Sequence, residues 1–380
     1  MTCLTWNFIK EDAGGHINQE EKNVAKDILE QGFDLYTRYF LIARVADEVR
    51  TKTPMRILDA GGGAGLLGSF LKKDKIVVMD ILSSSPGCIL GDITHAPFES
   101  QSFDLVISSD VYEHIQSAKR AEAISEMLRL SRNIVILGAP FYSPEVEEAE
   151  VIANNFWLKA TGEPHRWLRE HIENKLPYEN ELESILKERG YDFYKFGTNN
   201  LPTWLMLMLF SYYAQRYQIP QDKVGGVWHF YNENFADLGD FEEPTYRKIY
   251  LIGKRGTLPQ VSLYKDSKVD RLKQHRLKSL VFDTILEATM EKVAHIANLE
   301  ASLQEKVAQI QQIQHSIPMQ LVNRYQRIVE RLLRPGTRGR NYYELVLRGV
   351  RVILNEGWKS FFREVRAYLR GKRDRASKQP

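Results

Sequence analysis

The sequence predicts an α/β fold with a doubly wound, mostly parallel sheet of seven strands, followed by a helical tail. Residues 55–60 form an apolar run that closes with an acid, and a glycine-rich turn follows it directly. Residues 66–71 then begin a helix, and residues 75–80 form a second apolar run that ends in Asp80. This succession of strand, glycine turn, helix and strand is the unit from which open parallel sheets are built.

The glycine turn and Asp80 together indicate a nucleotide-type ligand. Glycine lets the backbone approach a ligand closely, and the N-terminus of the next helix presents free N–H groups. Asp80 lies 19 residues after Gly61, a spacing that brings an acid on the second strand to ribose hydroxyls. Residues 63–68 match the dinucleotide pattern G-x-G-x-x-G, whereas a longer pattern places an acid ahead of alternating glycines. A glycine turn without any ligand is the third interpretation.

The longer pattern, Asp59-x-Gly61-x-Gly63-x-Gly65, resembles the first motif of class I S-adenosylmethionine-dependent methyltransferases. The segments that follow are similar to the later motifs of the type 11 branch, and they occupy residues 91–93, 97–98, 103–106 and 110–114. The resemblance covers residues 34–255. It implies a Rossmann-like sheet that ends in an antiparallel hairpin, an enzyme that transfers methyl groups, and S-adenosyl-L-methionine as its cofactor.

The resemblance also assigns cofactor-binding residues. It implies that the first motif wraps the methionine part of the cofactor, that the second strand supplies contacts to ribose and adenine, and that later segments meet the adenine edge and form the floor. These roles fall, in that order, on Asp59, Gly61, Gly63 and Gly65, on Asp80 and Ile81, and on Asp92, Ile93 and Ser109. Gly62 is an extra glycine that the simplest form of the motif lacks.

Three residues are candidate catalytic groups. A hydroxyl acceptor must lose its proton, and an imidazole suits that role near neutral pH. His114 follows the fourth expected strand and is the first candidate base, while Glu113 is an alternative base or orients His114. His165, and after it His171, lie in an insertion at residues 144–177 that is expected to form an acceptor lid. A loop histidine and a packing tryptophan are the structural alternative for that insertion, and the sequence predicts no metal site.

Hydrophobic spacing divides the chain into five regions. Residues 1–50 are expected to form a helical cap, residues 51–255 the methyltransferase domain with a helical insertion at 198–245, and residues 256–278 a linker. From Phe282 to Ile317 apolar residues recur at alternating steps of four and three, which predicts a coiled coil over 279–318 and therefore a homo-oligomer. Pro318 is expected to end or kink it. Basic amphipathic helices are expected over 319–380.

The charge of the chain is unevenly distributed. Residues 321–380 carry 16 Lys and Arg against 5 Asp and Glu, so that the net charge of +3 leaves −8 for the first 320 residues. An acidic catalytic part argues against nucleic acid as substrate. Basic helices with aromatic residues suit an anionic membrane surface or a docking partner, and packing on each other is the alternative. The tail resembles segments that connect methyltransferase domains to glycosyltransferases in bacterial surface-polysaccharide enzymes.

Three functions follow from these observations. The first is O-methylation of a cell-surface glycan or its lipid-linked precursor, the second is methylation of a small cytosolic metabolite, and the third is a non-catalytic scaffold in a glycan-synthesis complex. Two cysteines provide no disulfide framework, and Cys88 is expected to be a small buried residue of a core strand. Without a signal pattern or a run of 18 apolar residues, the expected location is the cytoplasm, peripheral to the inner face of the membrane.

Overall fold

The computed structural model describes residues 28–376, apart from residues 64, 83–85, 237–240, 260 and 262–269. The chain forms two compact units that meet between Met290 and Glu291. Cys3, most of the expected N-terminal cap and part of the expected linker fall outside the described residues.

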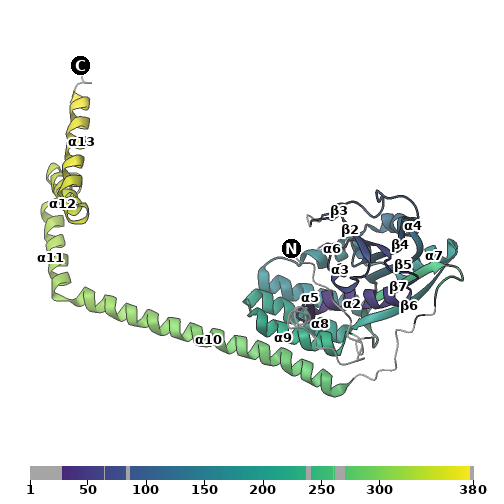
Figure 1. Cartoon of the computed structure of the whole chain (residues 1–380). Helices are drawn as coiled ribbons and strands as arrows, with labels where there is room; N and C mark the ends of the chain where they lie inside the picture. Colours follow the sequence, from purple (N-terminus) through teal and green to yellow (C-terminus); the bar gives the residue numbers. More distant parts are fainter. Residues whose placement is uncertain are drawn as a thin grey trace, which may run out of the picture. The chain divides into compact units, whose positions relative to one another are not determined.

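The first unit is built on the predicted seven-stranded sheet, with the strand order β3-β2-β1-β4-β5-β7-β6 (Figure 1). All neighbouring strands pair in parallel except β7, which runs antiparallel to both β5 and β6. The chain order reverses between β1 and β4, and ligands of open α/β sheets bind outside the carboxyl ends of strands at such a point. The strands are β1 (Arg56–Ala60), β2 (Lys75–Asp80), β3 (Ile89–Leu90), β4 (Phe103–Ser109), β5 (Ser131–Pro140), β6 (Tyr191–Asn200) and β7 (Thr245–Lys254).

Helices cover both faces of the sheet because successive strand residues point to opposite sides. Ile57 and its neighbours on one face pack against α2 (Phe33–Glu48) and the short α3 (Leu67–Phe70). Leu58 and its neighbours on the other face pack against α4 (Arg120–Leu130) and α7 (Glu179–Glu188). This two-sided burial explains why the central strands are almost continuously apolar.

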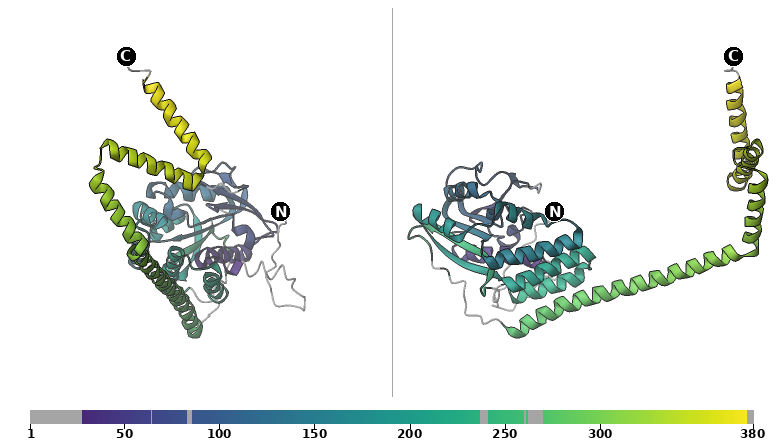
Figure 2. Two further views of the ribbon diagram at one scale, coloured as in Figure 1. Left: turned by 90° about the vertical axis from the view of Figure 1, so that its left-hand side faces the viewer. Right: turned by 180° about the vertical axis from the view of Figure 1, so that it is seen from behind.

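A third apolar cluster joins helices beyond the sheet. It contains α5 (Pro144–Thr161), α8 (Leu201–Tyr217) and α9 (Gln221–Asn234), of which α5 and α8 lie side by side in Figure 2. The apolar run at residues 201–213 is therefore a packed helix, with Trp204, Leu207 and Phe210 buried.

The first part of α10 (Arg271–His315) belongs to the same cluster. Leu277, Val281 and Ala288 are buried against α8 and α9. We expected the enzyme core to end near Arg255 and a linker to reach residue 278, but the packing of the first unit continues to Met290. The apolar residues at 277, 281 and 288 recur at helical spacing, so the signal was present ahead of the expected coiled coil.

Local expectations differ from the structure at two positions. Cys88 directly precedes β3, a strand of two residues at the edge of the sheet. It is only half-buried because an edge strand has a neighbouring strand on one side only. Asn180, with Glu183 three residues later, predicts an N-cap for the helix that precedes β6. The helix instead begins at Glu179, and its N-cap is Tyr178, two residues earlier than predicted, whose side chain makes no capping hydrogen bond.

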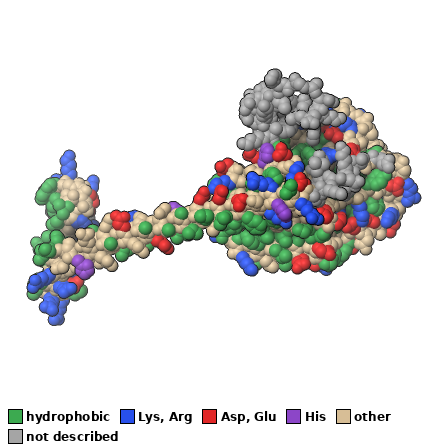
Figure 3. All heavy atoms as spheres, turned by 90° about the horizontal axis from the view of Figure 1, so that it is seen from below, with side chains coloured by type: hydrophobic (Ala, Val, Ile, Leu, Met, Phe, Trp, Pro, Cys, Tyr) green, Lys and Arg blue, Asp and Glu red, His purple; other side chains and the backbone are tan. Residues whose placement is uncertain are grey.

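The second unit consists of the remainder of α10 and three further helices, α11 (Ile317–Leu332), α12 (Arg338–Glu356) and α13 (Trp358–Ala376). Ser316 caps α11, whose first turn contains Pro318, so the proline ends α10 as expected. The apolar stripe of α10 is exposed, with Phe282 61% accessible, and hydrophobic side chains follow the helix in Figure 3. No helix among the described residues is long and apolar enough to cross a membrane.

Candidate functional site

A cavity of about 690 Å³ opens at the carboxyl ends of β1, β2 and β4. Its volume lies in the range of small-molecule and cofactor sites. The glycine turn, the end of β2 and residues 91–94 line one part of the cavity. The other part is lined by residues that follow β4, by α6 (Arg166–Asn174) and by side chains of α2, α8 and β7. A nucleotide-type ligand and an acceptor can therefore share one space.

The glycine turn is shaped by the acid that precedes it. Asp59 is buried at the end of β1, and a side chain at Gly62 would place its Cβ 2.3 Å from the Oδ2 atom of Asp59. Gly61 has a φ of 82°, and a Cβ there would lie 2.1 Å from Val111. The extra glycine of the motif is thus required by the Asp59 carboxylate rather than being a neutral departure.

Asp80 closes the turn from the second strand. Its carboxylate accepts hydrogen bonds from the backbone N–H groups of Gly63 (3.1 Å) and Leu82 (2.8 Å). Ile81 beside it is exposed in the cavity, which suits a side chain that would pack against a flat ring. Asp80 therefore lies where the sequence predicted a ligand contact, at the edge of the glycine turn.

The remaining predicted cofactor residues divide into two groups. Asp92 and Ile93 line the cavity, and Asp92 accepts a hydrogen bond from the N–H of Thr94 (2.8 Å). Gly65 faces Val78, and Ser109 is buried in β4, so neither lines the cavity. The sequence predicted cofactor contacts for both residues, whereas in the structure Gly65 belongs to the turn and Ser109 to the strand behind the cavity.

A buried ionic network forms one wall, and sequence analysis did not identify it. Asp110, at the end of β4, accepts two hydrogen bonds from Arg247 of β7 (2.6 and 2.5 Å) and one from Arg38 of α2 (2.8 Å). Arg247 also donates to Asp34 (3.1 Å) and to Asn199 (2.8 Å). Burial opposes the charge on Asp110, but the two guanidinium groups outweigh it and lower its pKa to about 2. The one available signal was Asp110 itself, a charged residue at the end of a buried strand.

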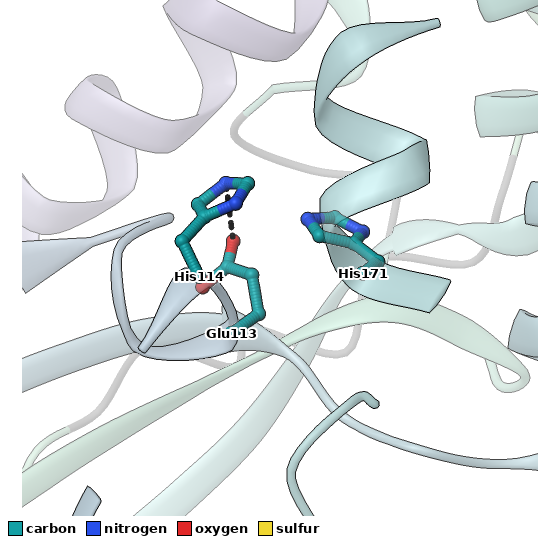
Figure 4. A group of neighbouring side chains, drawn as sticks. All are labelled: Glu113, His114 and His171. Carbon is teal, nitrogen blue, oxygen red and sulfur yellow. Dashed lines mark ion pairs between the residues drawn. The ribbon is translucent and has the colours of Figure 1, made fainter. Parts of the chain in front are cut away.

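Glu113 and His114 lie on the short helix η1 (Tyr112–His114), and α6 brings His171 beside them (Figure 4). The Nε2 atom of His114 lies 4.0 Å from Oε1 of Glu113, and its Nδ1 atom lies 3.1 Å from Oε2 of Glu170. His171 donates through Nδ1 to Oε1 of Glu150 on α5 (2.8 Å). Sequence analysis identified Glu113, His114 and His171 as candidate residues, but it did not predict that His171 lies beside the other two.

Burial is the largest single influence on the pKa of each group in this cluster. It raises the pKa of Glu113 to about 8, with the charge of Asp110 adding to the effect. Burial, together with the smaller effect of the neighbouring His171, lowers the pKa of His114 to about 4. For His171, burial also acts downward, but the hydrogen bond and charge of Glu150 outweigh it and raise the pKa.

Backbone contacts hold η1 against α6. Arg120 is buried and donates to the carbonyl oxygens of Glu113 (3.3 Å) and Ile115 (3.0 Å), and also to those of Asn174 (3.3 Å) and Lys175. The side chain of Asn174 donates to the carbonyl oxygen of His114 (3.0 Å). The distance between the two segments is therefore fixed on both sides of the cluster.

His165 lies elsewhere on the cavity wall. Its ring packs against Trp157 and Tyr212, with ring centroids 5.3 and 4.9 Å apart. Trp167 is 45% exposed, and its ring centroid lies 5.2 Å from that of His114. The predicted lid therefore contributes an aromatic surface beside His114, whereas His165 is a packed cavity residue.

Comparison with known proteins identifies one domain. Residues 58–134 match the family model described as a methyltransferase domain, which is about a fifth of the chain. No curated protein matches the sequence. Among solved structures, the magnesium protoporphyrin IX methyltransferase of Synechocystis PCC 6803 is 14% identical and covers 64% of this chain and 90% of its own, with a TM-score of 0.34. The YcgJ protein of Bacillus subtilis is 14% identical and covers 57% and 98%, with a TM-score of 0.35.

The matched segment contains the end of β1, the glycine turn, β2, β3, β4 and η1. This segment therefore matches a methyltransferase domain, for which the sequence predicted S-adenosylmethionine as cofactor. The residues present fit this cofactor. Gly61 and Gly63 form a cradle without side chains, and the buried Oδ2 atom of Asp59 receives no hydrogen bond from any described residue.

Proposed function

We propose that this S-adenosylmethionine-dependent methyltransferase methylates a hydroxyl group of a cell-surface glycan or of its lipid-linked precursor. One observation carries the proposal: beyond the glycine turn, the same cavity is lined by carboxylates, imidazoles, guanidinium groups and the exposed indole ring of Trp167. Sugars present hydroxyl groups that pair with charged side chains and C–H faces that pack on aromatic rings. A small cytosolic metabolite with the same groups is the alternative acceptor.

The chain's own residues would bind and orient this acceptor. When bound, S-adenosylmethionine supplies an electrophilic methyl group. Trp167 offers a flat surface beside His114, and Glu170 offers an acceptor for hydroxyl protons. Because an acceptor hydroxyl must lose its proton, the cluster on η1 is the part of the wall at which we place that hydroxyl.

The tail supports an acceptor at a membrane surface. Residues 321–380 carry a net charge of +11, and Trp358, Phe362 and Tyr368 of α13 are exposed. Such helices suit anionic lipid, on which lipid-linked glycans are assembled. The exposed stripe of α10 suits self-association, and a glycosyltransferase is a further partner that the tail would accommodate.

The test is methyl transfer from labelled S-adenosylmethionine to fractions of the source cells. We expect label in the glycan or lipid-linked fraction as alkali-stable O-methyl groups. Trp167→Ala should raise the KM for that acceptor and leave S-adenosylhomocysteine binding unchanged, whereas Trp157→Phe, a change that retains an aromatic ring, is the matched control. Label in the small-molecule extract would support the metabolite, and cofactor binding without transfer to any fraction would support a scaffold.

A further inference from the structure

The Glu113, His114 and His171 side chains form a cluster that acid–base roles alone do not explain. They offer one carboxylate oxygen and two imidazole nitrogens that all lie within 4.8 Å of one another (Figure 4). Two imidazoles and one carboxylate are the ligands of many catalytic zinc sites and of non-haem iron sites. A metal was not predicted, because His171 lies 57 residues from His114 along the chain and the two meet only through the packing of α6 on η1.

Two buried atoms of the cluster lack hydrogen-bond partners among the described residues, which favours a cation site. Glu113 is 1% exposed, and no hydrogen bond from the described residues reaches its Oε2 atom. His171 is 5% exposed, and its Nε2 atom likewise has no partner in the described part of the chain. A buried carboxylate and a buried ring nitrogen are costly to leave without partners. One cation between them would satisfy both.

The second ring nitrogen of His171 is already arranged as in metal sites. Glu150 accepts hydrogen bonds from Nδ1 of His171 (2.8 Å) and from the hydroxyl of Tyr246 (2.9 Å). Because the carboxylate can only accept, Nδ1 carries the proton and Nε2 is left as the coordinating atom. A carboxylate behind a histidine fixes the ring and raises its basicity toward a metal. Oε2 of Glu170 lies 3.1 Å from Nδ1 of His114, an ion-pair distance whose geometry does not make a hydrogen bond.

We propose that Glu113, His114 and His171 bind a divalent transition-metal ion, with Zn²⁺ as the ion that the ligand set favours. A zinc ion holds its ligand atoms about 2.0–2.2 Å away, so the three side chains would close toward one another by side-chain rotation. Two of the ligands lie on the short helix η1. Arg120 and Asn174 hold this helix against α6, so the backbones of the ligands are already close and only their side chains need to rotate. The cavity side of the cluster leaves room for a further ligand.

The inferred ion gives the cluster a role in the reaction, and this role rests on the proposed function. An ion at this position would bind the acceptor's hydroxyl oxygen and lower its pKa. The hydroxyl proton would pass to the carboxylate of Glu170, the acceptor oxygen would form its bond to the methyl carbon, and the bond from that carbon to sulfur would break. His114 and Glu113 would then be metal ligands, and neither would act as the base.

Metal binding is measured on the full chain without a polyhistidine tag, after treatment with a chelator. Calorimetric titration should give one Zn²⁺ per chain, and titration with Co²⁺ should give visible bands without the thiolate charge-transfer that cysteine ligands produce. Mg²⁺ should bind far more weakly, because it prefers oxygen ligands. Absence of Zn²⁺ binding, or a thiolate spectrum, would overturn the site.

Variants separate ligands from neighbours. Glu113→Gln and His171→Gln should each lower Zn²⁺ affinity at least tenfold, and Glu150→Gln should lower it by about 10–100-fold, as second-sphere changes do. His165→Gln, a histidine of the same cavity, should retain one Zn²⁺ per chain. Equal loss in His165→Gln would place the site elsewhere. S-adenosylhomocysteine binding by each metal-free variant reports whether the fold is intact.

The outcomes also separate this inference from the proposed function. If the metal-free chain binds cofactor and methylates its glycan acceptor at an unchanged rate, the role of the ion in the reaction is refuted and the proposed function stands. If Zn²⁺ binds as expected but no glycan is methylated, the site stands and the acceptor assignment fails.

Discussion

Removing the charge of Asp59 should change how the stability of the first unit depends on pH. Burial raises the pKa of this carboxyl from 3.8 to about 7, Arg38 opposes the rise and Asp80 adds to it. The folded pKa lies above the unfolded value, so the unfolded chain releases the proton first as the pH rises. Stability from this group is therefore greatest below about pH 4 and falls until about pH 7.

The magnitude follows from that pKa difference. One pKa unit corresponds to about 1.4 kcal/mol, so the free energy of unfolding should fall by about 2–3 kcal/mol between pH 5 and pH 8 through Asp59 alone. Asp59→Asn lacks the titrating group and should lack this part of the fall. Its amide, like the carboxyl group of wild type, has no partner at the Oδ2 position among the described residues, so this unpaired position is common to both proteins at every pH.

Urea unfolding of both proteins without cofactor, at several pH values between 5 and 8, tests the prediction. The difference in free energy of unfolding between wild type and variant should shift by about 2–3 kcal/mol in favour of the variant as the pH rises from 5 to 8. Other titrating groups are shared and cancel in the difference. A difference that stays constant over this range would show that Asp59 is ionised throughout and that our account of its burial fails.

Four further predictions concern the cofactor, the domain boundary and the tail. Asp80→Ala should weaken S-adenosylhomocysteine binding by about 1.5–3 kcal/mol in calorimetry, the scale of hydrogen bonds to a charged group, and NAD should not bind to either protein. A chain that ends at Met290 should unfold at a higher urea concentration than one that ends at Arg255, since the shorter one lacks Leu277 and Val281; equal midpoints would contradict the extended boundary. Light scattering should give a dimer for the full chain, and a monomer at micromolar concentration would rule out pairing through α10. The full chain should sediment with anionic vesicles, and deletion of residues 341–380 should abolish this sedimentation. High salt should weaken it without abolishing it, because screening reduces the charge attraction and leaves the apolar contribution. A full chain that does not bind the vesicles at low salt would leave the tail as a docking element.

The sheet and the glycine turn were predictable because local patterns encode them. Apolar runs that end in acids, with Gly61 and Asp80 at a fixed spacing, specify strands and a turn without any long-range information. The sequence could not show that Gly62 is required, because that requirement comes from where the Asp59 carboxylate turns after β1. The two-residue β3 was expected to be a buried strand because its composition is apolar, whereas its place at the sheet edge leaves it exposed.

The acceptor side of the cavity was less predictable because it is assembled from distant segments. Arg247 lies beside Lys248 near the start of β7, and nothing local shows that it pairs with Asp110. His171 and His165 are equivalent as residues of one insertion, yet α6 turns His171 toward Glu113 while Trp157 and Tyr212 enclose His165. Such pairings depend on how helices pack, which spacing along the chain does not encode.

The contacts of α2 have a consequence for the order in which the chain folds during synthesis. Asp34 meets Arg247 across 213 residues of sequence, and the carbonyl oxygens of Leu29 and Gln31 meet Asn232 across 203 and 201 residues. At a synthesis rate of 5–20 residues per second, about 10–40 s separate the emergence of α2 from that of its partners. The parallel strands can pair during this interval, but α2 cannot gain these contacts. The ionic wall of the cavity is therefore among the last parts of the first unit to form, and a nascent chain halted before β7 would have the glycine turn without a closed site.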